Sequence, residues 1–569
     1  MRIVIVGGVA AGMSAAARAR RLTEGAHIVV LERGEHVSFA NCGLPYYVGG
    51  EINDPASLLV QTPKSLAASL NLDVRVRHNV TAIDARAKTV HVESDGTHED
   101  IGYDALILAP GAVAARPPIA GMEDSVRVRT LRTVDDALAL RESAENGSRH
   151  AVVLGAGFIG IEAAEALALQ GLNTSIVEYA EHVLPPLEQE MASLVTEELG
   201  RLGVVVHERL AARRIVPEEL SDTVILSDGT QLQADIIVLS TGVRPDTAAF
   251  EDSGVECERG AIVVDEYGRT SLPDVYAAGD ATVSTDAVTG IRRPVALAGP
   301  ANRAGRQIAD AIVRPDSARP IPAPMGTAIV RVGGLTAAMT GANRASLRQA
   351  GIRFHTLHLH PGQHAGYFPG AEQIHLIVHI RRSDGMVLGA QAVGKDGVDK
   401  RIDVLATAIR NHMGVSDLID LDLAYAPPYG SAKDPINMVG MVGSNVMDGL
   451  LPLWYAEEWK DWRERALVLD VRSMTEFSTG HLPGALNIPH TQLRERMEEV
   501  RIASNGRPVR VLCQSGVRSH IANRILANAG FDTASLSGGM LTVRAMLGTD
   551  VLEYGEQDTN LTFSTSGVR

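Results

Sequence analysis

The sequence predicts an α/β protein built from several domains. Two glycine-rich turns, each following an apolar strand, indicate two Rossmann-like dinucleotide-binding domains. The length of 569 residues exceeds what one hydrophobic core organises, so further domains are expected after them. Aromatic residues make up only 4% of the chain, which indicates the aliphatic cores that are typical of buried parallel strands.

The first dinucleotide-binding unit starts at the N-terminus. Strand Ile3–Val6 leads into a glycine turn, an alanine-rich helix follows, and strand His27–Leu31 ends at Glu32. The glycines let the backbone approach a pyrophosphate at the helix N-terminus, and the carboxylate accepts hydrogen bonds from ribose hydroxyls. Val9 stands where the pattern has its middle glycine, so this unit departs from the full pattern. The glycines expected to contact the dinucleotide are Gly7, Gly8 and Gly12.

The second unit matches the glycine pattern in full, at Gly155, Gly157 and Gly160, and its second strand ends at Glu178. A carboxylate at this position bonds both ribose hydroxyls and repels a 2′-phosphate, and no arginine follows it directly. NADH is therefore expected in preference to NADPH. Tight strand–helix turns without a ligand are the alternative, but two complete units in one chain argue against it.

Three apolar strands that end in glycine turns complete this part of the chain: Tyr103–Gly111, Ile236–Gly242 and Val275–Asp280. With them, residues 1 to about 445 resemble the flavin-containing pyridine nucleotide-disulfide oxidoreductase family. The resemblance implies that the first unit binds FAD, that the second binds the nicotinamide nucleotide, and that Asp280 holds the ribityl chain of the flavin. It also implies cofactor contacts at Arg33, Ala109, Gly111, Gly242, Gly279 and Ala298.

The same resemblance implies the domain boundaries. The FAD-binding domain would comprise residues 1–112 and 245–322, and the NAD(H)-binding domain residues 113–244. Residues 323–445 would form an α+β dimerisation domain, so we expect a homodimer. An irregular apolar segment with glycine, asparagine and proline then predicts a linker over 446–460.

The last domain carries motifs of its own. An apolar strand over Ala466–Val471, the segment Gly480–Ala485, and a strand over Val509–Leu512 that ends at Cys513 resemble the rhodanese domain. The resemblance implies an α/β fold over residues 461–556.

Cys513 opens a loop that runs to Arg518 and leads into a helix. Backbone N–H groups of such a loop point at the sulfur and, together with the helix dipole and Arg518, favour a thiolate and then a persulfide. A lone cysteine after an apolar strand is otherwise a buried core residue. The Cys-x2-Gly-x-Arg spacing resembles active sulfurtransferases and favours the catalytic interpretation, with Asp470 and Arg472 supporting the fold.

Cys42, in the segment Ser38–Tyr46, is the other cysteine in a reactive context. Three cysteines in the whole chain cannot form a disulfide framework, and their scarcity fits a reducing cytosol, so a cytoplasmic location is expected. No second cysteine closely follows Cys42, so its oxidised form is a sulfenic acid or a mixed disulfide with a small thiol. Cys257 lies in no such context.

The segment around Cys42 most resembles that of the coenzyme A disulfide reductases, in which asparagine precedes the cysteine. Tyr367 and Tyr425 match two tyrosines that, in that family, approach the redox centre from the dimer partner. A phenol there could protonate a departing thiolate. Packing at a subunit interface is the alternative for both residues, because tyrosine is enriched at interfaces.

Coenzyme A carries phosphate groups, so its site needs cations. Arg18 and Arg21 lie one turn apart on the first expected helix and share a face. A solvated helix face is the alternative for these two arginines. By the same resemblance, the remaining substrate-binding positions are Ser38, Asn41, Asn302 and Lys433.

The composition excludes several classes of partner. A formal net charge of −15 argues against nucleic acid or an anionic membrane as the main partner. No uncharged apolar run reaches the roughly 18 residues that a membrane helix needs. No metal is expected.

The combined expectation is an FAD-dependent NADH:coenzyme A disulfide, persulfide or polysulfide reductase. Cys42 would be its redox cysteine, and Cys513 would deliver sulfane sulfur that leaves as hydrogen sulfide. A flavin NADH oxidase or peroxidase, which cycles Cys42 through sulfenic acid, is the nearest alternative. A redox sensor or sulfur-carrier protein, whose flavin half only binds and signals, is the alternative from another class.

Overall fold

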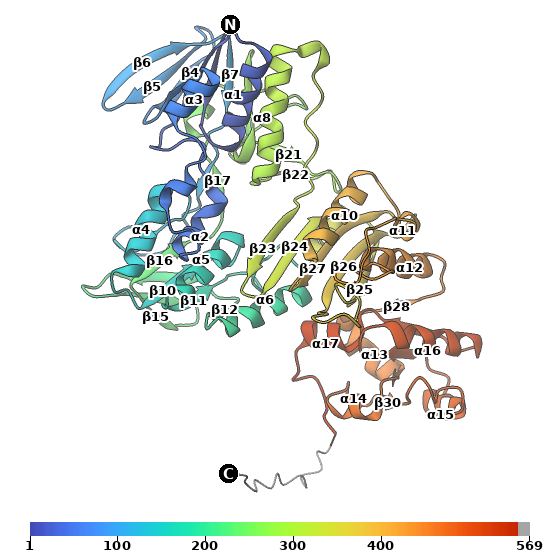
Figure 1. Cartoon of the computed structure of the whole chain (residues 1–569). Helices are drawn as coiled ribbons and strands as arrows, with labels where there is room; N and C mark the ends of the chain where they lie inside the picture. Colours follow the sequence, from blue (N-terminus) through green and yellow to red (C-terminus); the bar gives the residue numbers. More distant parts are fainter. Residues whose placement is uncertain (556–569) are drawn as a thin grey trace. The chain divides into compact units, whose positions relative to one another are not determined.

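The computed structural model describes residues 1–555 and divides into two compact units (Figure 1). The first unit comprises Met1–Pro186 and Val195–Gly334, and the second comprises Leu187–Leu194 and the chain from Leu335 onward. The expected end of the last domain, at residue 556, lies outside the described residues. Within that range, the helices are too short or too polar to cross a bilayer.

The first unit contains the parallel sheet predicted from the first glycine turn. Its strands, in the order β20-β7-β1-β2-β3, are Val275–Ala277, Ala105–Leu108, Arg2–Val6, His27–Leu31 and Asp73–Arg75. All neighbouring strands are parallel. Helix α1 (Ala10–Leu22) lies beside α8 (Ala298–Val313) (Figure 1). The two helices approach closely at Gly305, since it has no Cβ: an added Cβ would lie only 2.0 Å from the carbonyl oxygen of Ala11.

A second parallel sheet corresponds to the second glycine turn. Its strands, in the order β12-β11-β10-β16-β9, are Val205–His207, Asn173–Val177, His150–Leu154, Ile236–Leu239 and Val128–Arg129. Helix α5 (Phe158–Leu169) connects β10 to β11, so this crossover has the predicted strand–helix–strand order.

Two antiparallel sheets and several short elements complete the first unit. The sheets are formed by β4 (Asn79–Asp84), β5 (Thr89–Ser94) and β6 (Thr97–Gly102), and by β13 (Ala212–Val216), β14 (Asp222–Leu226) and β15 (Gln231–Ala234). Two-stranded pairs join β8 (Ala112–Ala114) to β17 (Val243–Pro245), β18 (Cys257–Glu258) to β19 (Ala261–Ile262), and β21 (Val283–Thr285) to β22 (Arg292–Pro294). The other elements are α2 (Leu44–Val48), α3 (Pro63–Leu70), α4 (Val134–Glu145), α7 (Ala248–Glu251) and β23 (Ala328–Val332). Helix α6 (Gln189–Arg201) is divided between the units, because its residues up to Leu194 belong to the second one.

The second unit starts with an antiparallel sheet and helices, as expected for the dimerisation domain. Strands β24, β27, β26 and β25 follow one another across the sheet and span Leu335–Gly341, Val387–Gly394, Ile374–Arg381 and Phe354–Leu359. The accompanying helices are α9 (Arg344–Gln349), α10 (Val398–Arg410), α11 (Val415–Ile419) and α12 (Pro435–Met447).

The C-terminal domain is a parallel sheet with helices. Its strands, in the order β28-β32-β31-β29-β30, are Leu453–Trp454, Thr533–Leu536, Val509–Leu512, Leu467–Asp470 and Leu486–Asn487. Its helices are α13 (Trp459–Arg465), α14 (Met474–Ser478), α15 (Met497–Ser504), α16 (Val517–Asn528) and α17 (Gly539–Leu547).

Part of the segment 446–460, expected as a linker, belongs to this last domain. Strand β28 pairs with β32, and the Trp454 side chain is buried, with its indole N–H donating to the carbonyl oxygen of Val511 over 3.2 Å. The linker expectation is corrected from residue 453 onward. Local composition missed this strand because its apolar residues stand among prolines and glycines and show no alternation.

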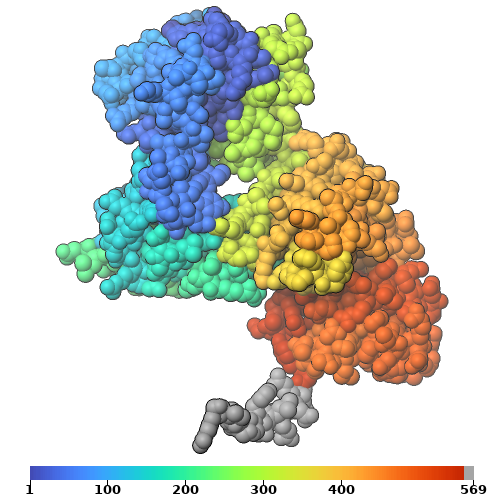
Figure 2. Space-filling view, viewed as in Figure 1, coloured from blue at the N-terminus to red at the C-terminus, as the bar shows by residue number. Residues whose placement is uncertain are grey.

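A buried polar network, which we call the docking network, joins the two domains of the second unit. The His358 ring bonds Ser537 of the last domain through Nδ1 (2.8 Å) and Glu190 through Nε2 (2.8 Å). Arg344 contacts Glu190 and Glu188, and Glu188 also bonds His379 over 3.1 Å. The two domains lie directly against one another in the space-filling view (Figure 2).

Candidate functional site

Cys42 lies at the surface of the first unit. It sits in the 3₁₀ turn Asn41–Gly43, directly before helix α2. Partial burial, and secondly the negative charge of Glu162, raise the pKa of its thiol. Asn41 is also exposed, and Ser38 adopts a left-handed backbone with φ of 49°. The Ser38 N–H donates a hydrogen bond of 2.8 Å to the carbonyl oxygen of Gly8, in the first glycine turn.

Glu162 was not among the residues predicted for the site. It lies on α5, two residues after Gly160, and accepts a hydrogen bond from the Tyr46 hydroxyl over 3.3 Å. Burial, and then the charge of Glu165, raise its pKa to about 7, although Tyr46 and Arg331 oppose the shift. The one feature of the sequence that could have pointed to Glu162 is its position directly after the second glycine pattern. A carboxyl group that changes charge near neutral pH therefore acts electrostatically on Cys42.

The residues predicted to hold FAD form a cradle at the N-terminus of α1. Gly7 has φ of +96°, and a Cβ there would lie 2.0 Å from the carbonyl oxygen of Ala109. Glu32 accepts the N–H groups of Gly8 and Gly34, both at 2.8 Å. Only glycine allows this close approach of Gly7 to Ala109, and the tight turn that results leads into a helix N-terminus, which is the place where such units bind a pyrophosphate.

Other predicted flavin contacts lie in the same unit. Burial raises the pKa of Asp280, and Arg132 opposes that shift at 3.9 Å. A partly buried carboxylate with few partners suits the binding of a polyol such as the ribityl chain. Gly279 starts the 3₁₀ turn that contains Asp280, and Ala298 is the first residue of α8. Arg33 forms an ion pair with Asp246.

The residues predicted to bind the nicotinamide nucleotide form a similar cradle. Glu178 is buried and accepts the N–H groups of Ala156 (2.6 Å) and Ala180 (2.7 Å). A Cβ on Gly160 would lie 1.9 Å from the carbonyl oxygen of Gly155, whereas a Cβ on Gly157 would meet nothing within 4 Å. Gly157 therefore leaves open space at the helix N-terminus, which suits a pyrophosphate. Gly242, with φ of +110°, follows β16.

The cationic side chains predicted to bind coenzyme A differ in whether a carboxylate of the protein already pairs with them. Arg18 pairs with Asp310 of α8 at 2.6 Å, so its charge is already matched within the protein. Arg21 is exposed and donates to the carbonyl oxygen of Ala17, and Lys433 is exposed in the second unit. Asn302, on α8, is exposed, and its side-chain oxygen accepts a hydrogen bond from the Ser14 hydroxyl of α1.

Tyr367 and Tyr425 come together in the second unit. Their hydroxyl oxygens are 3.0 Å apart, although each residue lies on a different exposed loop. The hydrogen bond between the two hydroxyls is the main cause that raises the pKa of Tyr367. A bonded pair of exposed phenols can donate one proton and replace it from its neighbour.

In the Cys513 loop, one backbone N–H of the kind expected points at the sulfur. The Gly516 N–H donates to Cys513 Sγ over 3.2 Å, and Gly516 has φ of +100°. The Ser519 hydroxyl, missed by the sequence analysis, lies 3.4 Å from the sulfur. Cys513 is buried at the N-terminus of α16, so backbone dipoles stabilise a negative charge on the sulfur.

Arg518 faces this loop but is held by a carboxylate. Glu476 accepts two hydrogen bonds from its guanidinium, at 2.7 Å and 2.6 Å. The bond from Arg518 is the largest cause that lowers the pKa of Glu476 to about 2. Beneath them, Asp470 and Arg472 form a buried pair at 2.7 Å, and Arg472 also bonds the carbonyl oxygen of Gly480.

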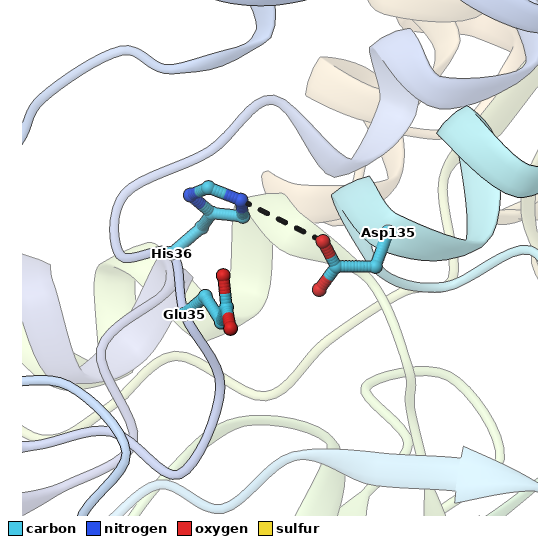
Figure 3. Close-up of side chains that lie close together, drawn as sticks. All are labelled: Glu35, His36 and Asp135. Atoms are coloured by element: carbon cyan, nitrogen blue, oxygen red, sulfur yellow. Dashed lines mark ion pairs between the residues drawn. The ribbon is translucent and has the colours of Figure 1, made fainter.

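Glu35, His36 and Asp135 form a cluster of potential metal ligands on the first unit (Figure 3). The imidazole Nε2 faces an Asp135 oxygen at 3.8 Å. Arg77 occupies the Glu35 carboxylate through a hydrogen bond of 2.6 Å. We assign no metal here, because the carboxylates are exposed and one of them is already paired.

The comparisons with known proteins place these sites in a family context. The family profile described as "Pyridine nucleotide-disulphide oxidoreductase" matches residues 1–305, and the profile of its dimerisation domain matches 327–434. The rhodanese-like domain profile matches residues 455–545. The last match starts inside the segment expected as a linker, in agreement with β28.

Individual proteins give the same picture. A coenzyme A disulfide reductase of Staphylococcus haemolyticus is 32% identical over 451 residues, which is 77% of this chain and 98% of that protein. The crystal structure of reduced CoADR-RHD from Bacillus anthracis has 38% identity and a TM-score of 0.94, over 97% of this chain and 99% of the other. An NAD-dependent persulfide reductase from A. fulgidus has 38% identity and a TM-score of 0.89, over 95% and 100%.

Proposed function

Because the chain belongs to the pyridine nucleotide-disulphide oxidoreductase family, we propose that it is an NADH-dependent reductase of coenzyme A disulfide, persulfide or polysulfide. Enzymes of this family bind FAD and NAD(H), and both glycine cradles fit these dinucleotides. The single observation that supports the substrate class is that one chain carries two separate reactive-cysteine sites. They are Cys42 after the first cradle and Cys513, whose sulfur accepts the N–H of Gly516.

The reaction starts at Cys42. Its thiolate attacks the sulfur of a persulfide R–S–SH that is bonded to R, which forms a Cys42–S–S–R disulfide and releases HS⁻. Bound FAD, reduced by NADH, would supply the electron pair that cleaves this disulfide. The cleavage regenerates the Cys42 thiolate and releases R–S⁻. The net change is RSSH + NADH + H⁺ → RSH + H₂S + NAD⁺.

The substrate thiol would be coenzyme A. Lys433 and Arg21 are exposed cations that could bind its phosphates, whereas Arg18 would contribute less because Asp310 matches its charge. Tyr367 and Tyr425 would protonate the departing thiolate, and in a homodimer they would do so for the partner's Cys42. The family's dimerisation domain supports the dimer.

Cys513 would load sulfane sulfur for this reaction. A polysulfide or thiosulfate-type donor would transfer sulfur to the Cys513 thiolate, and the persulfide would pass to coenzyme A or to another small thiol. The N–H of Gly516 and the charge of Arg518 support a persulfide there, because both stabilise negative sulfur.

The test is anaerobic NADH consumption with sulfide quantified, using as substrates coenzyme A disulfide, coenzyme A persulfide, hydrogen peroxide, and a polysulfide or thiosulfate together with coenzyme A. We expect Cys42→Ser to abolish turnover of the first two, and Cys513→Ser to weaken only the use of polysulfide or thiosulfate-type donors. Cys257→Ser is the matched control and should behave as the wild type. Equal losses in both active-site variants with every substrate would contradict this division of roles.

The same assay separates the alternatives. If peroxide is the best substrate and no sulfide appears, the protein is a peroxidase that cycles Cys42 through sulfenic acid. If NADH consumption stops after a single turnover with every sulfur substrate, the sensor or carrier function is favoured.

A further inference from the structure

Two loops of the second unit carry the tyrosine pair. The first loop runs from Gly362 to Gln373, which form an isolated bridge at its base, and it contains Tyr367. The second loop joins α11 to α12 and contains Tyr425. Tyr367 is 76% exposed and Tyr425 is 48% exposed, so apolar packing does little to fix either ring. A cavity of about 450 Å³ also borders Tyr425.

Hydrogen bonds join these loops. The Ala365 N–H donates to the carbonyl oxygen of Gly430 over 2.9 Å, which ties the first loop to the second. Within the second loop, Tyr429 and Gly430 both donate their N–H groups to the carbonyl oxygen of Ala426. The hydroxyl bond between Tyr367 and Tyr425 is thus the outer end of a two-loop assembly.

The Arg401 side chain lies beneath this assembly. It belongs to α10 and is only 1% exposed. Its Nη2 donates to the carbonyl oxygen of Gln363 (2.9 Å), at the start of the first loop, and to Asp434 Oδ2 (2.8 Å), at the end of the second. A Cβ on Gly397 would lie 2.4 Å from its Nη1, so glycine there makes room for the guanidinium.

Asp434 extends this support to the other end of the second loop. It is buried and caps α12 by accepting the Ile436 N–H (3.1 Å), while its own N–H donates to Asn437 Oδ1. The Asn437 amide in turn donates to the carbonyl oxygens of Leu418, Ile419 and Leu421, where the second loop begins. Arg401 therefore connects to both loops at their bases.

We infer that Arg401 is a positioning residue, which sets the separation of the Tyr367 and Tyr425 hydroxyls by holding the bases of their two loops together. The inference rests on the proposed function, in which this pair donates a proton to a departing thiolate. Only a guanidinium suits the task, because its planar fork reaches the Asp434 carboxylate and the carbonyl oxygens of Gln363 and Gly397 in different directions. Lysine keeps the charge but cannot make these contacts together.

The main test is Arg401→Lys combined with Tyr367→Phe. We expect Arg401→Lys to lower kcat with coenzyme A disulfide or persulfide by about 10- to 100-fold, because a small misplacement of a proton donor has a large effect on rate. The rate of flavin reduction by NADH should not change. In the Tyr367→Phe background, Arg401→Lys should cost less than about 3-fold, since the pair it positions is already broken.

Arg344→Lys is the matched control. Arg344 is another buried arginine of the second unit, and it pairs with glutamates of the docking network instead. Its effect on kcat should be the same with and without Tyr367→Phe. If the effect of Arg401→Lys is likewise unchanged by Tyr367→Phe, Arg401 has only a structural role and the inference is overturned.

A titration separates this inference from the proposed function. The difference in tyrosinate absorbance between each protein and its Tyr367→Phe derivative reports the pKa of Tyr367. Arg401→Lys should lower that pKa relative to the wild type, because the bond to Tyr425 raises it. If the single variant Tyr367→Phe keeps full activity while Arg401→Lys lowers the pKa of Tyr367, the pair does not donate the proton and that part of the proposed function fails. The positioning role of Arg401 then still stands. An unchanged pKa overturns the positioning.

Asp434→Asn is the milder variant should Arg401→Lys not fold. Asparagine still caps α12 but weakens the pair with Arg401. A smaller loss of kcat, again reduced in the Tyr367→Phe background, is the expected result. Wild-type turnover and an unchanged Tyr367 titration in a folded Asp434→Asn protein would overturn the inference.

Discussion

The Gly516 N–H donates to Cys513 Sγ over 3.2 Å, so the sulfur that we propose as the nucleophile of the last domain has a backbone donor that no side-chain substitution removes. Arg518, the charged member of this site, depends by contrast on Glu476, which accepts two bonds from it. The position of the Arg518 side chain thus depends on a residue of another helix, α14.

Glu476→Gln should therefore impair sulfur transfer by Cys513. The amide loses the negative charge that holds Arg518, so the guanidinium is free to move away from the sulfur. We expect thiosulfate:cyanide sulfurtransferase activity to fall about tenfold, which is the loss of one charge-assisted contact. NADH-dependent reduction at Cys42 should be unaffected. Glu499→Gln, in an exposed pair with Arg496, is the control and should change neither activity.

Glu162→Gln should lower the pKa of the Cys42 thiol. Ionised Glu162 raises that pKa, and Glu162 itself has a pKa of about 7, so its influence is present above neutral pH and absent below it. The measurement is the pH dependence of Cys42 alkylation by iodoacetamide after reduction of the protein. We expect the profile of the variant to lie at lower pH. Glu123→Gln, at an exposed pair with Arg116, should leave the profile in place, and identical profiles for all proteins would contradict the coupling.

Acid should destabilise the docking network in two steps. Burial lowers the pKa of His379, so the unfolded chain binds a proton that the folded chain resists, and the free energy of unfolding falls as pH drops below about 6.5. Burial alone would raise the pKa of Glu190, but His358 and Arg344 outweigh it and lower that pKa. The contribution of ionised Glu190 to the free energy of unfolding is therefore complete above about pH 4.5 and is lost as the pH falls further.

Glu190→Gln tests the second step. The variant leaves Arg344 with less negative charge in a buried site, so we expect a loss of about 3 kcal/mol in the free energy of unfolding at pH 7. Calorimetry from pH 7.5 to about 3 should show a flatter decline below about pH 4.5 than in the wild type. Glu197→Gln, at an exposed position of the same helix, should match the wild type. A variant as stable as the wild type would show that the network contributes nothing to docking.

Gly157→Ala and Gly160→Ala should separate cofactor binding from folding. At Gly160 a Cβ would lie 1.9 Å from the Gly155 carbonyl oxygen, so we expect a lower unfolding temperature. At Gly157 the Cβ meets nothing within 4 Å, so the fold should persist. The methyl group would instead occupy the space of the pyrophosphate and weaken NADH binding about tenfold. Stopped-flow flavin reduction over a range of NADH concentrations checks this, and unchanged NADH binding in Gly157→Ala would be the contrary result.

The local sequence was sufficient for elements whose signal lies in neighbouring residues. Both strand–turn–helix units form where the glycines predicted them, because only glycine permits the backbone contacts at Gly7 and Gly155. The linker expectation was wrong from residue 453 onward, because β28 exists only through its pairing with β32, a strand much later in the chain. Isolated short strands carry no periodic pattern by which to find them.

The sequence by itself determined the two dinucleotide folds, the order of the domains and the two cysteines in reactive contexts, because each follows from short motifs. Only the tertiary structure decided which side chains act on one another. Glu162 reaches the surroundings of Cys42, and Arg401 connects the loops of Tyr367 and Tyr425. The physical reason is that burial and hydrogen bonding between distant segments set the charge and position of these groups, and neither is encoded in local spacing.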